Sequence, residues 1–198
     1  MNEALVEELL ALKRRDLSTR ARLLESGVLF DGYSEEMEQV HVENATALET
    51  ILEDHGWPGV SLVGEEGAEA AWLVVQHAIS LPDFQYFALQ QLRRTVAAGE
   101  APGWQEAYLT DRIRMNQQRP QVFGTQLDWD ANGELSPWPI EAPAEVDKRR
   151  AEAGLVPLAE AIELARQHAS DEGHTPPADF EQSRDRQEAW ARKVGWIE

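Results

Sequence analysis

The sequence predicts a mainly α-helical domain with a small β-hairpin and a C-terminal helical tail. Three observations predict this fold class. Apolar residues recur at helical spacing through most of the chain, Asn132-Gly133 lies in a weakly alternating segment, and "SDEGHTPPAD" has the composition of a linker. The length of 198 residues fits one domain with an appendage. We therefore expect one helical domain with the hairpin over 1–169, followed by a linker and an amphipathic tail over 170–198.

The N-terminal half predicts four helices. Gly27 is a plausible stop for the first helix, and Ser34 is a typical cap for the second. The third helix is apolar on every side in its middle, which indicates a central position in the fold. The short segment "VSLVG" before it is expected to be a strand fragment or an extended link. The four predicted helices span about 2–26, 34–54, 65–80 and 83–98.

The C-terminal half predicts three helices, a hairpin and the tail. The hairpin is expected over about 121–140, with Asn132-Gly133 at or near its turn. Pro137 and Pro139 make its second arm an edge or an irregular segment, because proline has no N–H to donate. Phe180 and Trp190 are candidate docking residues of the tail. The predicted helices span about 103–116, 143–153 and 157–169, with the tail helix over 178–194.

The charge of the chain is strongly acidic, with 36 acids, 18 Lys or Arg and a formal net charge of −18. No Lys or Arg stands between Arg22 and Arg93. Such a surface repels phosphate groups, so we expect no nucleic-acid partner and no membrane surface. No apolar run approaches the length of a membrane span, and the N-terminus has the pattern of an amphipathic helix, so a cytoplasmic protein is expected. The absence of cysteine excludes a thiolate nucleophile and a zinc–sulfur site.

Polar side chains interrupt several apolar helix faces. Gln76 and His77 end the apolar run of "AAWLVVQHA", and His41 lies on an otherwise apolar stripe with Asn44. The pair Asp111-Arg112 stands among apolar residues of another predicted helix. Burying such groups costs a few kcal/mol each unless they find partners, which favours a shared polar pocket.

The predicted catalytic residues are His77 as general acid or base and Asp111 as its orienting partner. Arg112 is expected to anchor an anionic group of the substrate. The structural alternatives are a core histidine satisfied by a carbonyl or carboxylate, and an ordinary ion pair for Asp111 and Arg112. No named catalytic or nucleotide-binding motif is present, so no cofactor and no metal are expected. The further predicted substrate-binding residues are Gln76, Thr125, Gln126, Trp72 and Tyr108.

A set of segments along residues 40–160 carries a resemblance to a known family. The segments include "GWPG", "VGEEGAEAAWLVVQHA", "AYLTDRI", "QVFGTQ", "PWPIE" and "VDKRRAEAGLVPL". Together they resemble an uncharacterised bacterial family, the domain of unknown function 6624. The resemblance implies one compact domain and supplies no reaction. Phe123 stands where this family is expected to carry a tyrosine. The polar positions that match the family pattern are Gln76, His77, Gln85, Asp111, Arg112, Gln121, Thr125, Gln126, Asp147, Arg149 and Arg150.

Three functions remain open from the residues. The first is a cofactor-independent enzyme that acts on a small polar molecule through acid–base chemistry at His77. The second is an acidic binding protein, of the immunity or antitoxin kind, whose helix over 34–54 holds a basic protein partner. The third is a metal-dependent enzyme that uses His41, His77 and nearby carboxylates, although these two histidines lack a diagnostic spacing.

Overall fold

The computed structural model describes residues 1–26 and 34–198. About 69% of the structure is helical, and the prediction of a mainly α-helical fold with a small hairpin and a C-terminal helix is confirmed. The chain falls into two compact units, Met1–Ala101 and Pro102–Glu198, and each is described by itself. The predicted boundary between 1–169 and 170–198 lies within the second unit. Within the described ranges, no helix combines the length and apolar character that a membrane crossing requires.

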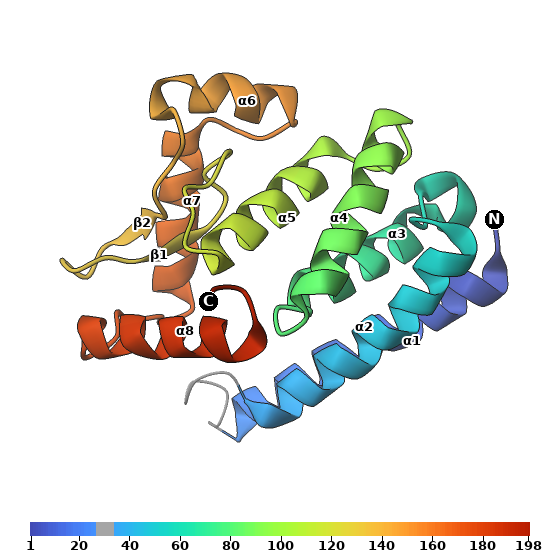
Figure 1. Cartoon of the computed structure of the whole chain (residues 1–198), viewed down its shortest axis with the longest axis horizontal. Coiled ribbons are helices and arrows are strands. Elements are labelled where there is room, and N and C mark those ends of the chain that lie inside the picture. Colours follow the sequence, from blue (N-terminus) through green and yellow to red (C-terminus); the bar gives the residue numbers. More distant parts are fainter. Residues whose placement is uncertain (27–33) are drawn as a thin grey trace. The chain divides into compact units, whose positions relative to one another are not determined.

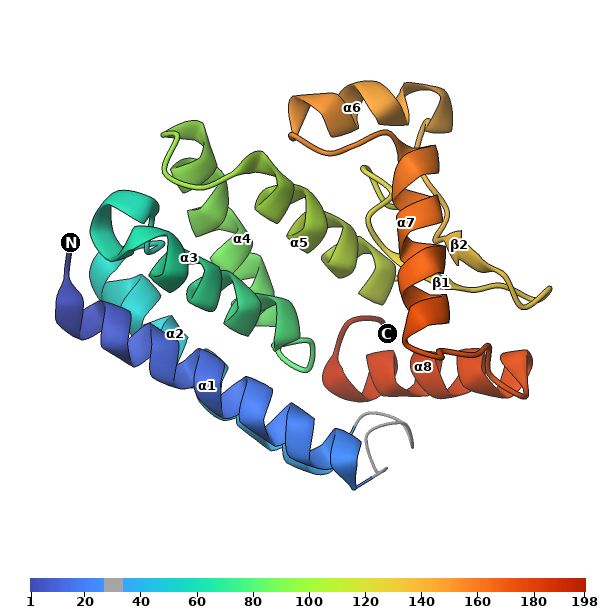
Figure 2. The same ribbon diagram turned by 180° about the vertical axis from the view of Figure 1, so that it is seen from behind.

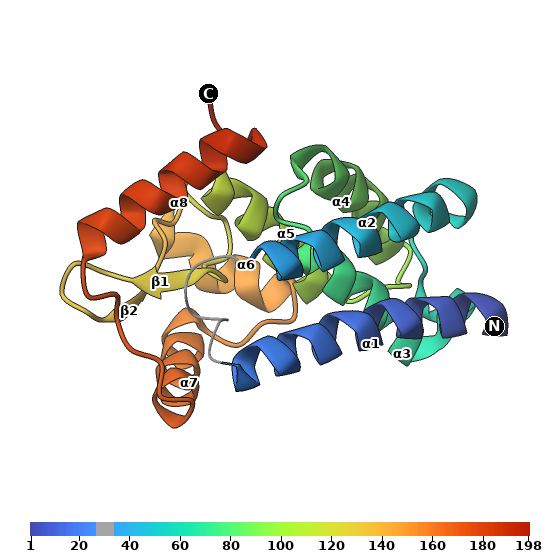
Figure 3. The same cartoon turned by 90° about the horizontal axis from the view of Figure 1, so that it is seen from below.

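The first unit consists of four helices. The long helix α1 runs antiparallel to α2, and α3 packs against both (Figures 2 and 3). Leu9, Leu48 and Val75, one from each of these helices, are completely buried and form part of the core. The four helices are α1 (Glu3–Glu25), α2 (Glu35–His55), α3 (Val60–His77) and α4 (Pro82–Ala97).

Local signals explain two of these helix starts. The Asn2 side chain accepts from the N–H of Leu5 at 3.2 Å and so caps α1, and Pro82 occupies the first turn of α4. Ser34 precedes α2 as predicted, but its side chain makes no capping bond. The predicted stop of the first helix, Gly27, lies outside the described residues.

The prediction for "VSLVG" is wrong, because this segment forms the first turn of α3. The N–H of Val60 donates to the carbonyl of Glu100, and the N–H of Ser61 donates to the Glu100 side chain at 2.9 Å. A residue 39 positions away therefore caps the helix start, and the N-cap residue Gly59 makes no side-chain capping bond of its own. Gly64, with a φ of 70°, kinks α3 just after this turn.

The second unit combines α5 with the hairpin and three further helices (Figure 1). Helix α7 packs on the second strand of the hairpin. Near the chain end, Ala191 and Trp196 are buried, and the guanidinium of Arg184 lies 4.6 Å from the ring centre of Trp138. The elements are α5 (Gly103–Asn116), β1 (Leu127–Trp129), β2 (Leu135–Pro137), the 3₁₀ turn η2 (Pro143–Glu145), α6 (Val146–Glu152), α7 (Leu158–Asp171) and α8 (Phe180–Val194).

The hairpin is shorter than predicted, although its antiparallel pairing and the position of its turn are confirmed. The side chain of Gln121 explains where the strands stop. Its amide donates to the carbonyls of Gln126 and Trp138, and its oxygen accepts from the N–H of Gln126. A buried glutamine thus bridges the two arms where ladder hydrogen bonds would otherwise continue.

Candidate functional site

The predicted catalytic histidine lies in a cluster of three side chains from three helices. Asp16 comes from α1, His41 from α2 and His77 from the last residue of α3. Asp16 continues the buried stripe of Leu5, Leu9 and Leu12 on α1, which turns it into the unit. We call Asp16, His41 and His77 the His–Asp–His centre.

One carboxylate oxygen joins the two imidazoles of this centre. His77 Nδ1 lies 2.8 Å from Asp16 Oδ2, and His41 Nε2 lies 3.2 Å from the same oxygen. The two rings are 5.0 Å apart between their centroids and tilted by 42°. The other oxygen, Asp16 Oδ1, is buried and accepts no hydrogen bond from any residue that the structure describes.

The electrostatics of the centre favour an ionised Asp16. Burial raises the pKa of this carboxyl, but the adjacent imidazoles of His41 and His77 lower it more, and the net pKa lies well below the usual 3.8. The neighbouring base in the chain does not supply the balancing charge. Arg15 instead donates to Asn44 and Glu43, each at 2.9 Å. The two imidazoles are therefore the polar groups that contact the Asp16 carboxylate most closely among the described residues.

Solvent reaches the centre at His77. The His77 side chain is 32% exposed, whereas Asp16 is fully buried and the His41 side chain is 9% exposed. Glu38 lies one helical turn before His41 and accepts from the hydroxyl of Ser80 at 2.5 Å. A hydroxyl and a second carboxylate thus lie close in sequence to the two histidines.

This arrangement permits two kinds of chemistry. The Nε2 atom of His77 has no partner among the described residues and is available for proton transfer. The three side chains also offer ligand atoms that all lie within 4.8 Å of one another, which makes them a group that could hold a metal ion.

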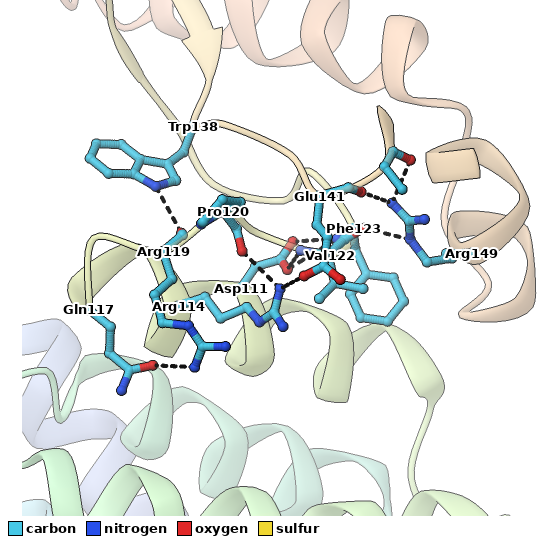
Figure 4. Close-up of polar contacts among 11 residues, drawn as sticks. Asp111, Arg114, Gln117, Arg119, Pro120, Val122, Phe123, Trp138, Glu141 and Arg149 are labelled. Atoms are coloured by element: carbon cyan, nitrogen blue, oxygen red, sulfur yellow. Dashed lines mark hydrogen bonds and ion pairs between the residues drawn. The ribbon is translucent and has the colours of Figure 1, made fainter. Parts of the chain in front are cut away.

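The predicted partner of His77, Asp111, holds a loop in the second unit. Its carboxylate accepts from the backbone N–H groups of Val122, Phe123 and Thr125, and from the Thr125 hydroxyl. Figure 4 shows the carboxylate directed at the backbone of Val122 and Phe123. Gln126 in turn donates to the Thr125 hydroxyl at 3.0 Å. Three predicted site residues, Asp111, Thr125 and Gln126, therefore do come together. We call the segment 121–126, which the Asp111 side chain holds, the Asp111 loop.

Two arginines fasten the Asp111 loop from the other side. The buried Arg150 donates to the carbonyls of Phe123 and Gly124, at 2.7 and 3.2 Å. Arg149 donates to the carbonyl of Val122 at 2.8 Å, as Figure 4 shows. The loop backbone is thus bound by a carboxylate through its N–H groups and by guanidinium groups through its carbonyls, which fixes its conformation.

The predicted roles divide accordingly. The carboxylate beside His77 is Asp16, which the sequence did not single out, whereas the pairing of His77 with Asp111 joins residues of the two units and stays a prediction. Arg112 is half-buried on α5, and burial lowers its pKa to about 10, so it stays charged at neutral pH. Its role as a substrate anchor also stays a prediction. Gln76 is buried beside His77 in sequence, and Trp72 and Tyr108 are half-buried.

The acidic helix over 34–54 is partly engaged within its own unit. Glu36 pairs with Arg22, Glu43 pairs with Arg15, and Glu38 holds Ser80. These contacts reduce the charge that the helix presents to a partner. Binding of a basic protein by this helix stays a prediction.

Comparison with known proteins gives one match. No curated protein and no solved structure is significantly similar to the chain. A family model matches residues 3–170, which include the His–Asp–His centre and the Asp111 loop and stop before α8. The chain therefore belongs to a family of unknown function, DUF6624.

Proposed function

We propose that the protein is an enzyme that acts on a small polar molecule by acid–base chemistry at His77. Asp16 orients the imidazole, and the chemistry needs no cofactor. One observation carries the proposal: His77 binds a buried carboxylate through Nδ1 and leaves Nε2 available at the exposed edge of the centre. This is the geometry in which a carboxylate fixes the imidazole tautomer for proton transfer.

The position of Asp16 supports this division of roles. A carboxylate at Nδ1 places the proton on that atom, so the lone pair of Nε2 is free to accept a proton from a substrate. The same carboxylate stabilises the imidazolium that forms after the transfer. Asp16 is fully buried and its pKa lies below the usual range, so it stays ionised while His77 changes its charge.

The charges near the centre favour a neutral or positively charged molecule. Asp16 and Glu38 are acidic, and the nearby bases Arg15 and Arg22 are each paired with a glutamate. An anionic substrate would meet like charge at this position, whereas a hydroxyl, amide or amine would not.

The proposal is tested by a search for turnover with three matched proteins. Wild type, His77→Gln and His168→Gln are each incubated with a neutral extract of small metabolites, and the mixtures are compared by mass spectrometry. His168 is the control, because its imidazole lies on the surface of α7 with its side chain 72% exposed. We expect at least one metabolite to be consumed by wild type and by His168→Gln, and consumed about 10²–10⁴-fold more slowly by His77→Gln.

Two results would count against the proposal. One is equal consumption by wild type and His77→Gln when both give the same unfolding curve in urea. The other is a wild-type protein that changes no metabolite over a prolonged incubation. Similar unfolding curves are expected for the variant, because His77 is partly exposed and makes one hydrogen bond to Asp16.

A further inference from the structure

We infer that Asp16, His41 and His77 form a binding site for one divalent transition-metal ion of the Zn²⁺ class. The inference goes beyond the proposed function, because binding of the ion does not require any reaction. The two proposals share Asp16 and Nδ1 of His77 but use them differently. In the acid–base proposal Asp16 orients His77 through Nδ1 and Nε2 transfers the proton, whereas the metal takes Nδ1 of His77, Nε2 of His41 and the Asp16 carboxylate as its ligands.

The separations of the ligand atoms fit a single ion. Zinc binds imidazole nitrogen and carboxylate oxygen at about 2.0–2.2 Å, which places two ligand atoms of a tetrahedral site about 3–3.5 Å apart. Asp16 Oδ2 lies 2.8 Å from His77 Nδ1 and 3.2 Å from His41 Nε2. All three ligand atoms lie within 4.8 Å of one another, so little movement is needed to surround one ion.

The buried state of Asp16 is the second observation. Its Oδ1 atom is fully buried without a hydrogen-bond partner among the described residues, although a carboxylate oxygen in that position costs about 1–3 kcal/mol when it is left unsatisfied. A metal ion held through both carboxylate oxygens would remove this cost, because Oδ1 would then be a ligand together with Oδ2. The Asp111 carboxylate offers a contrast, since both of its oxygens accept hydrogen bonds from the backbone of the loop.

The donor set selects the class of metal. Two imidazoles and one carboxylate suit Zn²⁺, Fe²⁺ and related ions, whereas Mg²⁺ and Ca²⁺ prefer oxygen ligands alone. A nitrogen that binds the ion cannot keep its proton, so binding releases protons. Three protein ligands leave a further position for water, as in catalytic zinc sites, and His77 is the ligand that solvent reaches.

The test uses the tag-free full chain, treated with a chelator and then titrated with ZnCl₂ by calorimetry. We expect one strongly bound Zn²⁺ per chain, weakened at least about 100-fold in Asp16→Asn and in His41→Gln. The control is the double variant His168→Gln/His174→Gln, which removes two surface imidazoles beside Glu172. Full binding in this control shows that adventitious surface histidines do not hold the ion.

A measurement on the wild type alone guards against variants that fail to fold. In histidine ¹⁵N NMR spectra, Zn²⁺ is expected to shift Nδ1 of the partly exposed His77 and Nε2 of the buried His41, because these two residues face the carboxylate through different nitrogens. Absence of strong binding, or binding that persists in His41→Gln, overturns the metal site. Turnover that needs His77 in chelator-treated protein would then leave the acid–base function standing, so the two proposals fail separately.

Discussion

Asp16 and Asp111 are both fully buried carboxylates, yet their surroundings differ in kind. Asp111 receives hydrogen bonds from three backbone N–H groups and a hydroxyl of the loop that it holds. Asp16 meets two imidazoles through one oxygen and leaves the other oxygen without a partner in the described part of the chain. The Asp111 carboxylate accepts hydrogen bonds from the backbone of a loop, whereas the Asp16 carboxylate has one oxygen that accepts none from the described residues.

We propose that this difference separates a structural carboxylate, Asp111, from a functional one, Asp16. Backbone N–H groups cannot change their charge, and they lose their partner when the carboxylate is removed, so Asp111 acts on stability. Imidazoles exchange protons and bind metals, so in the proposed functions the buried charge of Asp16 acts on chemistry. An unsatisfied buried group of this kind lowers stability and is retained where function needs it.

The largest loss in the free energy of unfolding is expected from Asp111→Ala, and it would test the structural role of this carboxylate. The change leaves several buried donors of the Asp111 loop without a partner, at a cost of about 3–5 kcal/mol in the free energy of unfolding. Urea unfolding followed by fluorescence measures it. The matched control is Asp147→Ala, since Asp147 accepts one backbone N–H, from Leu158, in an exposed position. A loss below about 1 kcal/mol for Asp111→Ala would remove the structural role.

A smaller loss in the free energy of unfolding is expected from Gly124→Ala, at a point where the Asp111 loop packs tightly against two side chains. Gly124 has a φ of 70°, and an added Cβ would lie 2.8 Å from Leu158 and 3.0 Å from Ile140. Gly124→Ala therefore combines backbone strain with overpacking and should cost about 2–3 kcal/mol. Gly154→Ala has a similar φ of 74° with nothing within 4 Å, and should show only the strain, about 1 kcal/mol. If the two variants lose equal free energy of unfolding, the loop must move to accommodate the added methyl group without cost, and tight packing at Gly124 is contradicted.

The smallest effect on stability is expected from Asp16→Asn. The pKa of Asp16 lies below its ordinary value, so its ionised form is the more favourable one and the neutral amide should destabilise the protein. The loss should be about 1 kcal/mol, because the amide keeps the shape and an oxygen acceptor for His77. The same urea experiment measures it. If Asp16→Asn loses as much free energy of unfolding as Asp111→Ala, both carboxylates have a structural role and the proposed difference between them is wrong.

Much of the fold was predictable because its signals are local. The helical spacing of apolar residues predicted the helices, and Asn132-Gly133 predicted the turn of the hairpin. The failures were non-local. The first turn of α3 is capped by Glu100, and the hairpin strands end where the Gln121 side chain bridges the two arms. Neither contact follows from residues near it in the chain.

The candidate site was predicted in part. The polar residues at the end of an apolar run pointed to His77, and the stripe on α2 pointed to His41. Asp16 was missed, although its spacing after Leu5, Leu9 and Leu12 placed it on a buried face. A carboxylate on such a stripe signals a buried partner, but it does not say which helix supplies that partner.

The sequence by itself determined which side chains would be buried, because hydrophobic periodicity assigns each residue to a face of its helix. Only the tertiary structure decided which buried polar groups meet, since α1, α2 and α3 bring together residues that are 25 to 61 positions apart. The physical reason is that a buried charge must find its partner in space. The tertiary packing places imidazoles beside Asp16 and backbone N–H groups beside Asp111.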